Sequence, residues 1–170
     1  MGRIYSVTAD NVTLTTAVRG LIGIATDVVA NELLSGGIIR IKRVEIGQAA
    51  NATSAMIHGA FSQRNQAATL THATARTPVS IDVGKPASAI HGDTAGHSPL
   101  HCGTGATVDT GGTYVDLWDF SFNSLNGYLW IPTPETEFVI RGTSVFCVRF
   151  LTADPGTLTG WSVGVLFEEL

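Results

Sequence analysis

Charged residues are scarce in this sequence. Asp, Glu, Lys and Arg make up 14% of its 170 residues, whereas an average globular protein contains about 25%. A chain of this length is expected to form one domain, and so few charges do not cover the surface of a monomer of that size. We therefore expect an exterior rich in Thr, Ser, Asn and Gly, part of which is hidden against other protein chains.

Positive charge is especially limited. The net charge is -4 and the isoelectric point is about 5.6, which argues against a nucleic-acid partner because such proteins carry a basic surface. Arg40, Lys42 and Arg43 form the one basic cluster. Their spacing is typical of the solvent face of a strand, and we interpret them in that way.

Cysteines and long apolar runs are also few. No apolar run is long enough to span a bilayer, and Arg3 is followed by only a short apolar stretch, so we expect neither a membrane partner nor a secretory signal. Cys102 and Cys147 are therefore predicted to be free thiols. Cys147 lies among Val145, Phe146 and Val148 and is predicted to be buried in the core.

Helical periodicity is nearly absent. Residues 23–34 come closest, with Asp27 as the cap of a short helical turn. Elsewhere apolar and polar residues alternate between Gly, Pro and Asn, which predicts an all-β chain. We expect one antiparallel β-sandwich over residues 1–170, a single jelly roll of about eight strands. The expected strands cover residues 12–17, 38–46, 55–62, 79–83, 114–122, 127–131, 137–140, 145–151 and 161–167.

Several local features refine this prediction. The apolar face of strand 38–46 changes near Arg43, which indicates a bulge or bend. The turn Asp154-Pro155-Gly156 predicts an antiparallel hairpin of the last two strands. The N-terminal segment 1–10 and the loop 84–112, which is rich in Gly, Thr and His, lie outside the expected strands. Both are expected to reach neighbouring subunits, and for the loop a flexible surface excursion is the alternative.

The sequence contains no recognisable catalytic motif. A Gly-x-Ser-x-Gly elbow, a Walker loop and a complete dinucleotide fingerprint are all missing. We therefore expect no enzyme activity, no catalytic residue and no cofactor.

Three loop histidines are the best candidates for a metal site. His91, His97 and His101, together with Asp93 and Cys102, could gather around zinc or nickel. Pro99 lies between His97 and His101, so these two do not share a helix. Solvated loop histidines are the favoured interpretation, and a metal-dependent sandwich enzyme is the alternative.

Two carboxylate pairs suggest glycoside hydrolysis as another possibility to examine. Asp116 and Asp119 flank Trp118, while Glu135 and Glu137 follow Trp130. A glycosidase needs two carboxylates that face one cleft. On an ideal strand Asp116 and Asp119 point to opposite faces, so we interpret these groups as solvated charges that discourage unwanted strand pairing.

The aromatic residues offer core and interface candidates. Tyr114, Trp118, Phe120 and Phe122 share one strand parity, and Tyr128 and Trp130 share another strand. Most of these side chains are expected in the core, and any that stay exposed would anchor an interface. An exposed aromatic row could instead stack on sugar rings, which keeps a carbohydrate-binding module as an alternative. The interface candidates are Ile4, Tyr5, Trp118, Tyr128, Trp130, His97 and His101.

Both ends of the chain resemble a known family. The stretch from Leu125 to Glu135, the C-terminal Phe167-Glu168-Glu169-Leu170 and the start Gly2 to Thr8 resemble the small jelly-roll virion proteins of tailed bacteriophages that decorate or cement the head. The middle of the chain, with its His-rich loop, departs from that pattern. The resemblance implies a trimer on the capsid surface, made in the host cytoplasm, that binds the major capsid protein and has no catalytic residues.

The functional hypothesis is therefore a capsid decoration protein. Three copies would pack around an axis and clamp neighbouring capsid subunits, with multivalency strengthening the attachment. The alternatives are a head-fibre or tail component, a carbohydrate-binding module and, last, the metal-dependent enzyme.

Overall fold

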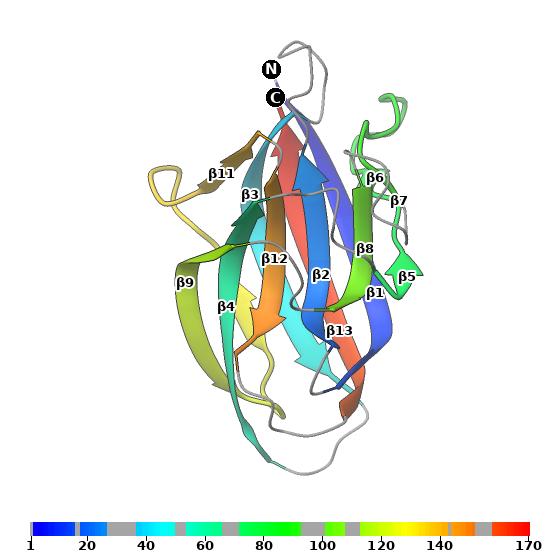
Figure 1. Ribbon diagram of the computed structural model, residues 1–170. Coiled ribbons are helices and arrows are strands. Elements are labelled where there is room, and N and C mark those ends of the chain that lie inside the picture. The colour runs from blue at the N-terminus through cyan, green and yellow to red at the C-terminus, as the bar shows by residue number, and fades with distance from the viewer. Residues whose placement is uncertain are drawn as a thin grey trace.

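Two β-sheets packed face to face make up the described part of the chain (Figure 1). The computed structural model describes residues 2–15, 18–26, 37–49, 54–65, 72–92, 101–107, 113–142, 144–151 and 158–170. These residues contain strands and turns but no helix. The predicted all-β sandwich is confirmed, and the single jelly roll stays a prediction.

Sheet A has the strand order β10-β3-β13-β1-β6, and β11 also pairs with β3. Its long strands run antiparallel, with Arg3 opposite Glu169 and Trp161 opposite Gln48. The bounds are β1 (Arg3–Leu14), β3 (Ile38–Gln48), β6 (Val79–Ser80), β10 (Tyr128–Trp130), β11 (Phe138–Arg141) and β13 (Leu158–Glu169).

Sheet B has the order β5-β8-β2-β12-β4-β9. All of these neighbours are antiparallel, whereas the two-residue strand β7 is parallel to β8. The bounds are β2 (Val18–Thr26), β4 (Met56–Asn65), β5 (Thr74–Ala75), β7 (His91–Gly92), β8 (His101–Thr107), β9 (Tyr114–Asn123) and β12 (Ser144–Phe150). The described chain thus has more strands than predicted, because several span only two to four residues.

Alternating apolar residues from both sheets form the core. Trp161, Val163, Val165 and Phe167 of β13 are all buried, which confirms the face that their alternation predicts. Across the sandwich the Trp161 ring lies 4.8 Å from that of Phe150 on β12, and both strands contribute to the same core cluster. Phe61 occupies the centre of an aromatic cluster that also contains Phe120, Tyr128, Trp130, Phe138 and Phe146.

The predicted bulge in β3 is confirmed. Leu166 pairs with Arg43 and Phe167 pairs with Ile41, so Lys42 is the extra residue. Its ammonium group lies 2.9 Å from Glu137 and 3.1 Å from Glu168. The bulge therefore keeps Ile41 and Val44, on either side of it, pointing into the core. Lys42 forms ion pairs with Glu137, just before β11, and with Glu168 of β13.

The N-terminal segment forms part of the sandwich. Residues 3–10 belong to β1, in which Tyr5, Val7 and Ala9 are buried and pair with β13. The prediction that residues 1–10 lie outside the strands is therefore wrong for residues 3–10, and their contact with neighbouring subunits stays a prediction. Their own apolar alternation commits them to the core face of sheet A.

The predicted C-terminal hairpin is also wrong. β12 pairs with β2 and β4 in sheet B, whereas β13 pairs with β1 and β3 in sheet A. Each strand carries an apolar face, and the two faces meet across the core instead of lying side by side. The turn residues 154–156 lie outside the described residues.

Two segments that were expected to lie outside the strands contain strands. Of the residues 23–34 predicted to form a helical turn, residues 23–26 are the end of β2. Residues 27–34 lie outside the described residues. The loop 84–112 contains β7 and β8. Small residues form β8 because its backbone pairs with β2 while Cys102 points into the core. Cys102 and Cys147 are free thiols, as predicted, and both are buried, which the sequence predicted only for Cys147.

The described residues contain no helix that could span a membrane.

Candidate interaction surface

Two interface candidates lie inside the subunit. The buried Tyr5 ring lies 6.0 Å from that of Phe167, and its hydroxyl donates a hydrogen bond to the Pro86 carbonyl at 3.2 Å. The Trp130 ring stacks on Phe138 at 4.6 Å, with the two planes only 4° apart. Both side chains therefore stabilise the fold and do not anchor another chain.

Trp118 remains accessible. Its residue is 49% exposed, and its indole N–H donates to the hydroxyl of the half-buried Tyr128 at 3.3 Å. The Tyr128 ring in turn stacks on Phe120 at 4.6 Å. Trp118 thus presents an aromatic surface at the open side of β9 while Tyr128 connects it to the core.

A bulge in β9 changes the predicted parity. Trp118 pairs with Phe61 and Asp116 pairs with Ser62, which makes Leu117 the extra residue. Tyr114 consequently leaves the face of Phe120 and packs on the outer face of sheet B, beside Arg149 at 4.5 Å.

The same bulge places Asp116 and Asp119 on one face, contrary to the prediction. Asp116 accepts hydrogen bonds of 2.6 Å from Ser62 and from Arg149. Burial acts to raise the pKa of Asp116, but these two hydrogen bonds and the charge of Arg149 outweigh it and lower the pKa. A carboxyl group with a lowered pKa stays ionised, so Asp116 is poorly suited to act as a general acid.

The second carboxylate pair is also held by other groups. Glu137 bonds to Lys42. The pKa of Glu135 is lowered by a hydrogen bond from its own backbone and by one from Thr133. Asp116, Glu135 and Glu137 are thus each held by a hydrogen bond or an ion pair within this chain.

The histidine candidates are only partly placed. His91 is exposed in β7 and lies opposite position 101 in the parallel register. His97 and Asp93 lie outside the described residues, as does the side chain of His101. Cys102 points into the core, and burial raises the pKa of its thiol although Arg76 acts to lower it. Cys102 is therefore removed from the predicted ligand set, and the described residues bring together no group of three His, Cys, Asp or Glu that could hold a metal.

Exposed apolar side chains gather along the β6 edge of sheet A. Val79 lies opposite Ser6, and the backbone N–H of Ile81 donates to the Ile4 carbonyl at 3.2 Å. This register places Val79, Ile81 and Ile4 on the outer face. Val83 follows at the tip of a turn closed by Asp82 and Lys85. We call Ile4, Val79, Ile81 and Val83 the β6 patch; the last three are 66%, 54% and 104% exposed.

A second apolar group lies at the opposite edge of the same sheet. Leu129 is opposite Glu45 and Val139 is opposite Arg40, so both point to the outer face. Ile131 follows β10 and is also exposed. We call Leu129, Ile131 and Val139 the β10–β11 patch. In Figure 1, β11 and β6 lie on opposite sides of the sandwich.

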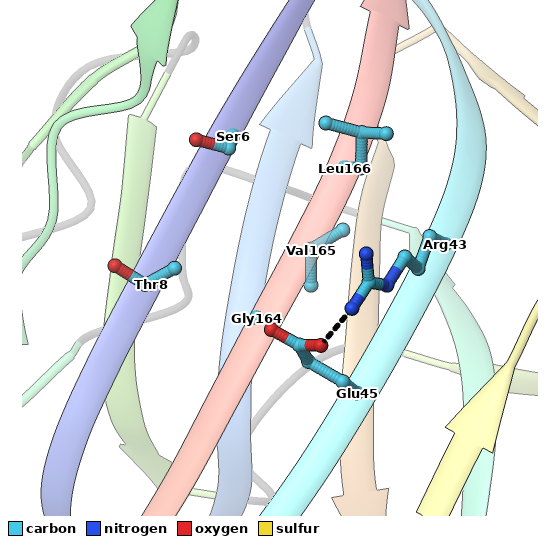
Figure 2. A pocket seen from close by; sticks show the side chains of 7 residues that line it. All are labelled: Ser6, Thr8, Arg43, Glu45, Gly164, Val165 and Leu166. Carbon is cyan, nitrogen blue, oxygen red and sulfur yellow. Dashed lines mark hydrogen bonds and ion pairs between the residues drawn. The ribbon is translucent and has the colours of Figure 1, made fainter. Parts of the chain in front are cut away.

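The outer face between the patches carries polar and apolar side chains. Figure 2 shows a shallow depression lined by Ser6 and Thr8 of β1, by Leu166 of β13 and by the ion pair between Arg43 and Glu45 of β3. Gly164 lies between them, and a Cβ atom there would stand only 2.6 Å from the Glu45 Oε1 atom. The strongly exposed large apolar side chains of this face, Ile4, Val79, Ile81, Leu129, Ile131 and Val139, lie towards its two edges.

Sequence reasoning missed this distribution. The alternation from Val79 to Val83 predicts a strand, but the same pattern occurs in core strands and in exposed edges.

Comparison of the chain with family models, with curated proteins and with solved structures finds no match.

Proposed function

We propose that this chain is a structural virion protein of the capsid decoration type, which assembles with copies of itself and binds the major capsid protein. The observation that carries the proposal is the exposure of large apolar side chains at both edges of sheet A. Such side chains are stabilised when another protein surface covers them. The low content of charged residues reduces the cost of removing this surface from water.

The sandwich would act as a rigid clamp. Its two sheets share one aromatic core, so force applied at one edge is carried to the other through packed side chains. Three copies held together as a trimer would each contact the capsid lattice, and the combined attachment would exceed that of one copy by far. The jelly-roll type and the resemblance of the chain ends to phage head proteins belong to this same proposal.

Three measurements test the proposal. Light scattering of the purified protein should give an oligomer, and the oligomer should sediment with heads of the virus that encodes the chain. Heads that carry it should rupture at a higher temperature than heads prepared without it. A protein that stays monomeric and does not sediment with the heads would contradict the proposal.

A glycan-binding role is the second candidate, because Trp118 exposes an aromatic ring held by Tyr128. Saturable binding to an oligosaccharide that Trp118→Ala abolishes would favour this role. Val115→Ala provides a matched control, since Val115 is exposed on the same strand. Binding that both variants retain would show that Trp118 is not the contact.

A further inference from the structure

The turn between β9 and β10 contains two asparagines, Asn123 and Asn126. We propose that Asn126 deamidates in the folded protein, by attack of the Gly127 main-chain nitrogen on its side chain, whereas Asn123 is protected. The modified residue would be an aspartate or an isoaspartate. This reaction is independent of the proposed function, because it involves only this turn and water.

The residue that follows Asn126 favours the attack. Asn126 and Gly127 form the only Asn-Gly pair in the sequence. A side chain on the following residue hinders access to its main-chain nitrogen, and glycine has none. Gly127 also has a φ of 69°, a backbone conformation that residues with a side chain rarely adopt.

Both reacting groups of this pair are available. Asn126 is exposed, and its side-chain amide forms no hydrogen bond with the residues that the structure describes. Within the same part of the chain, the N–H of Gly127 donates to no acceptor. The main-chain N–H of Asn126 donates to the Asn123 carbonyl at 2.9 Å, so the hydrogen bond that closes the turn uses neither reacting group.

Asn123 has the opposite arrangement. Its side-chain amide donates to the Ser54 hydroxyl at 2.6 Å, and its side-chain oxygen accepts from the Leu125 N–H at 3.0 Å. The nitrogen that would attack it belongs to Ser124, whose N–H donates to the Ala55 carbonyl at 2.9 Å. Breaking these hydrogen bonds costs free energy, so the structure protects Asn123 while it leaves its neighbour open.

The reaction consumes only water. The Gly127 nitrogen gives its proton to solvent and forms a bond to the Asn126 Cγ atom. The bond from Cγ to the side-chain nitrogen then breaks, and ammonia leaves with a proton from solvent. Water opens the resulting five-membered imide at either of its two carbonyl groups. One opening gives aspartate, and the other gives isoaspartate, in which the main chain runs through the side-chain carbon.

The product would change the attachment of β10. Both products add a negative charge to the turn, and isoaspartate also lengthens its main chain. Gly127 already lies so close to β3 that a Cβ atom on it would stand 2.8 Å from the Ile46 carbonyl oxygen. Tyr128 pairs with Ile46 directly afterwards. The isoaspartate form should therefore exchange the amide hydrogens of β10 faster than Asn126→Asp, which adds only the charge.

Incubation of the folded protein at mildly alkaline pH for several days, followed by peptide mass spectrometry, tests the proposal. The peptide that contains both asparagines should gain the mass difference between an amide and a carboxylic acid. Fragmentation should place the change at Asn126 and leave Asn123 intact. The rate should rise with pH, because the attacking nitrogen must lose its proton.

Two controls accompany this measurement. Asn126→Gln should lose the modification, because attack on its longer side chain requires a larger ring, and circular dichroism should show that the variant is folded. In denaturant Asn123 loses its hydrogen bonds and should also react. An Asn126 that stays intact in the folded protein but reacts in denaturant would overturn the proposal, and so would equal modification of both asparagines in the folded protein.

Discussion

Phe61 of β4 and Trp130 of β10 come from different sheets and meet in the core, with ring centroids 5.3 Å apart and planes at 62°. Phe61 is fully buried and also contacts the rings of Phe120, Phe138 and Phe146. Edge-to-face contacts of this kind add stability beyond the burial of area alone. The pair therefore connects the two sheets at the centre of the aromatic cluster.

Shortening Phe61 should weaken this connection strongly. Phe61→Ala removes a buried ring and leaves a cavity, so the free energy of unfolding should fall by about 3 to 5 kcal/mol. Phe61→Leu retains most of the volume and should cost about 1 kcal/mol. Chemical denaturation measures both values. A loss of less than about 1 kcal/mol for Phe61→Ala would show that the cluster does not depend on this ring.

The lowered pKa of Asp116 predicts a dependence of stability on pH. Because the pKa in the folded state is below the ordinary value of 3.8, the carboxylate stabilises the protein above that pH. This contribution is lost as the pH falls through the folded-state pKa. The difference in unfolding free energy between the original protein and Asp116→Asn should therefore shrink on acidification.

Denaturation at several pH values between about 7 and about 3 measures that difference. Asp119→Asn is the matched control, because Asp119 lies on the same strand and face but has no ion pair with Arg149 among the described contacts. A difference for Asp116→Asn that stays constant over this range would mean that its ion pair with Arg149 does not form in solution.

The buried cysteines should be unreactive in the folded protein. Burial raises the pKa of Cys147 to about 12, although Arg64 and Arg149 act to lower it, and burial also raises that of Cys102. The thiolate is the reactive form, so a thiol reagent at mildly alkaline pH should modify neither residue until the protein unfolds. Mass spectrometry before and after denaturation gives the number of modified thiols.

An exposed thiol provides the comparison. Met56→Cys introduces a cysteine on the accessible outer face of β4, and this variant should gain one modification per chain within minutes. Rapid modification of Cys147 in the folded protein would instead show that the outer face of sheet B opens readily.

Sequence patterns predict the long strands well because their apolar residues report directly on burial. β13 carries four alternating apolar residues and is found as predicted. β8 lacks large apolar residues, and it exists because its backbone pairs with β2 and because Gly103 leaves room for the ring of His72. The pairing with β2 and the packing of His72 on Gly103 both involve residues distant in sequence, so a local pattern does not predict β8.

The candidate surface was predicted less well, for related reasons. Alternation shows that a strand has an apolar face but not which sheet it joins, so β12 and β13 were assigned to one hairpin. The extra residue Leu117 reverses which face of β9 the residues before it occupy. Nothing in the local sequence marks this bulge. The exposed run from Val79 to Val83 looks like a core strand until its neighbours are known.

Two glycines with similar backbone angles separate local strain from close packing. Gly127 and Gly142 have φ values of 69° and 76°, so alanine at either position adopts a strained backbone, which costs about 1 kcal/mol. At Gly127 the new Cβ would also stand 2.8 Å from the Ile46 carbonyl oxygen, whereas nothing lies within 4 Å at Gly142. Since the nearby atom is backbone, β10 would have to move away from β3.

Gly127→Ala should therefore reduce the free energy of unfolding by about 1 to 3 kcal/mol more than Gly142→Ala does. Thermal unfolding of the two variants side by side measures this difference. Because Leu129 belongs to the β10–β11 patch, Gly127→Ala should also weaken association of the copies, whereas Gly142→Ala should leave it unchanged. Equal stability of the two variants would mean that the close approach of Gly127 to β3 is relieved at little cost, which would leave backbone strain as the reason for glycine at this turn.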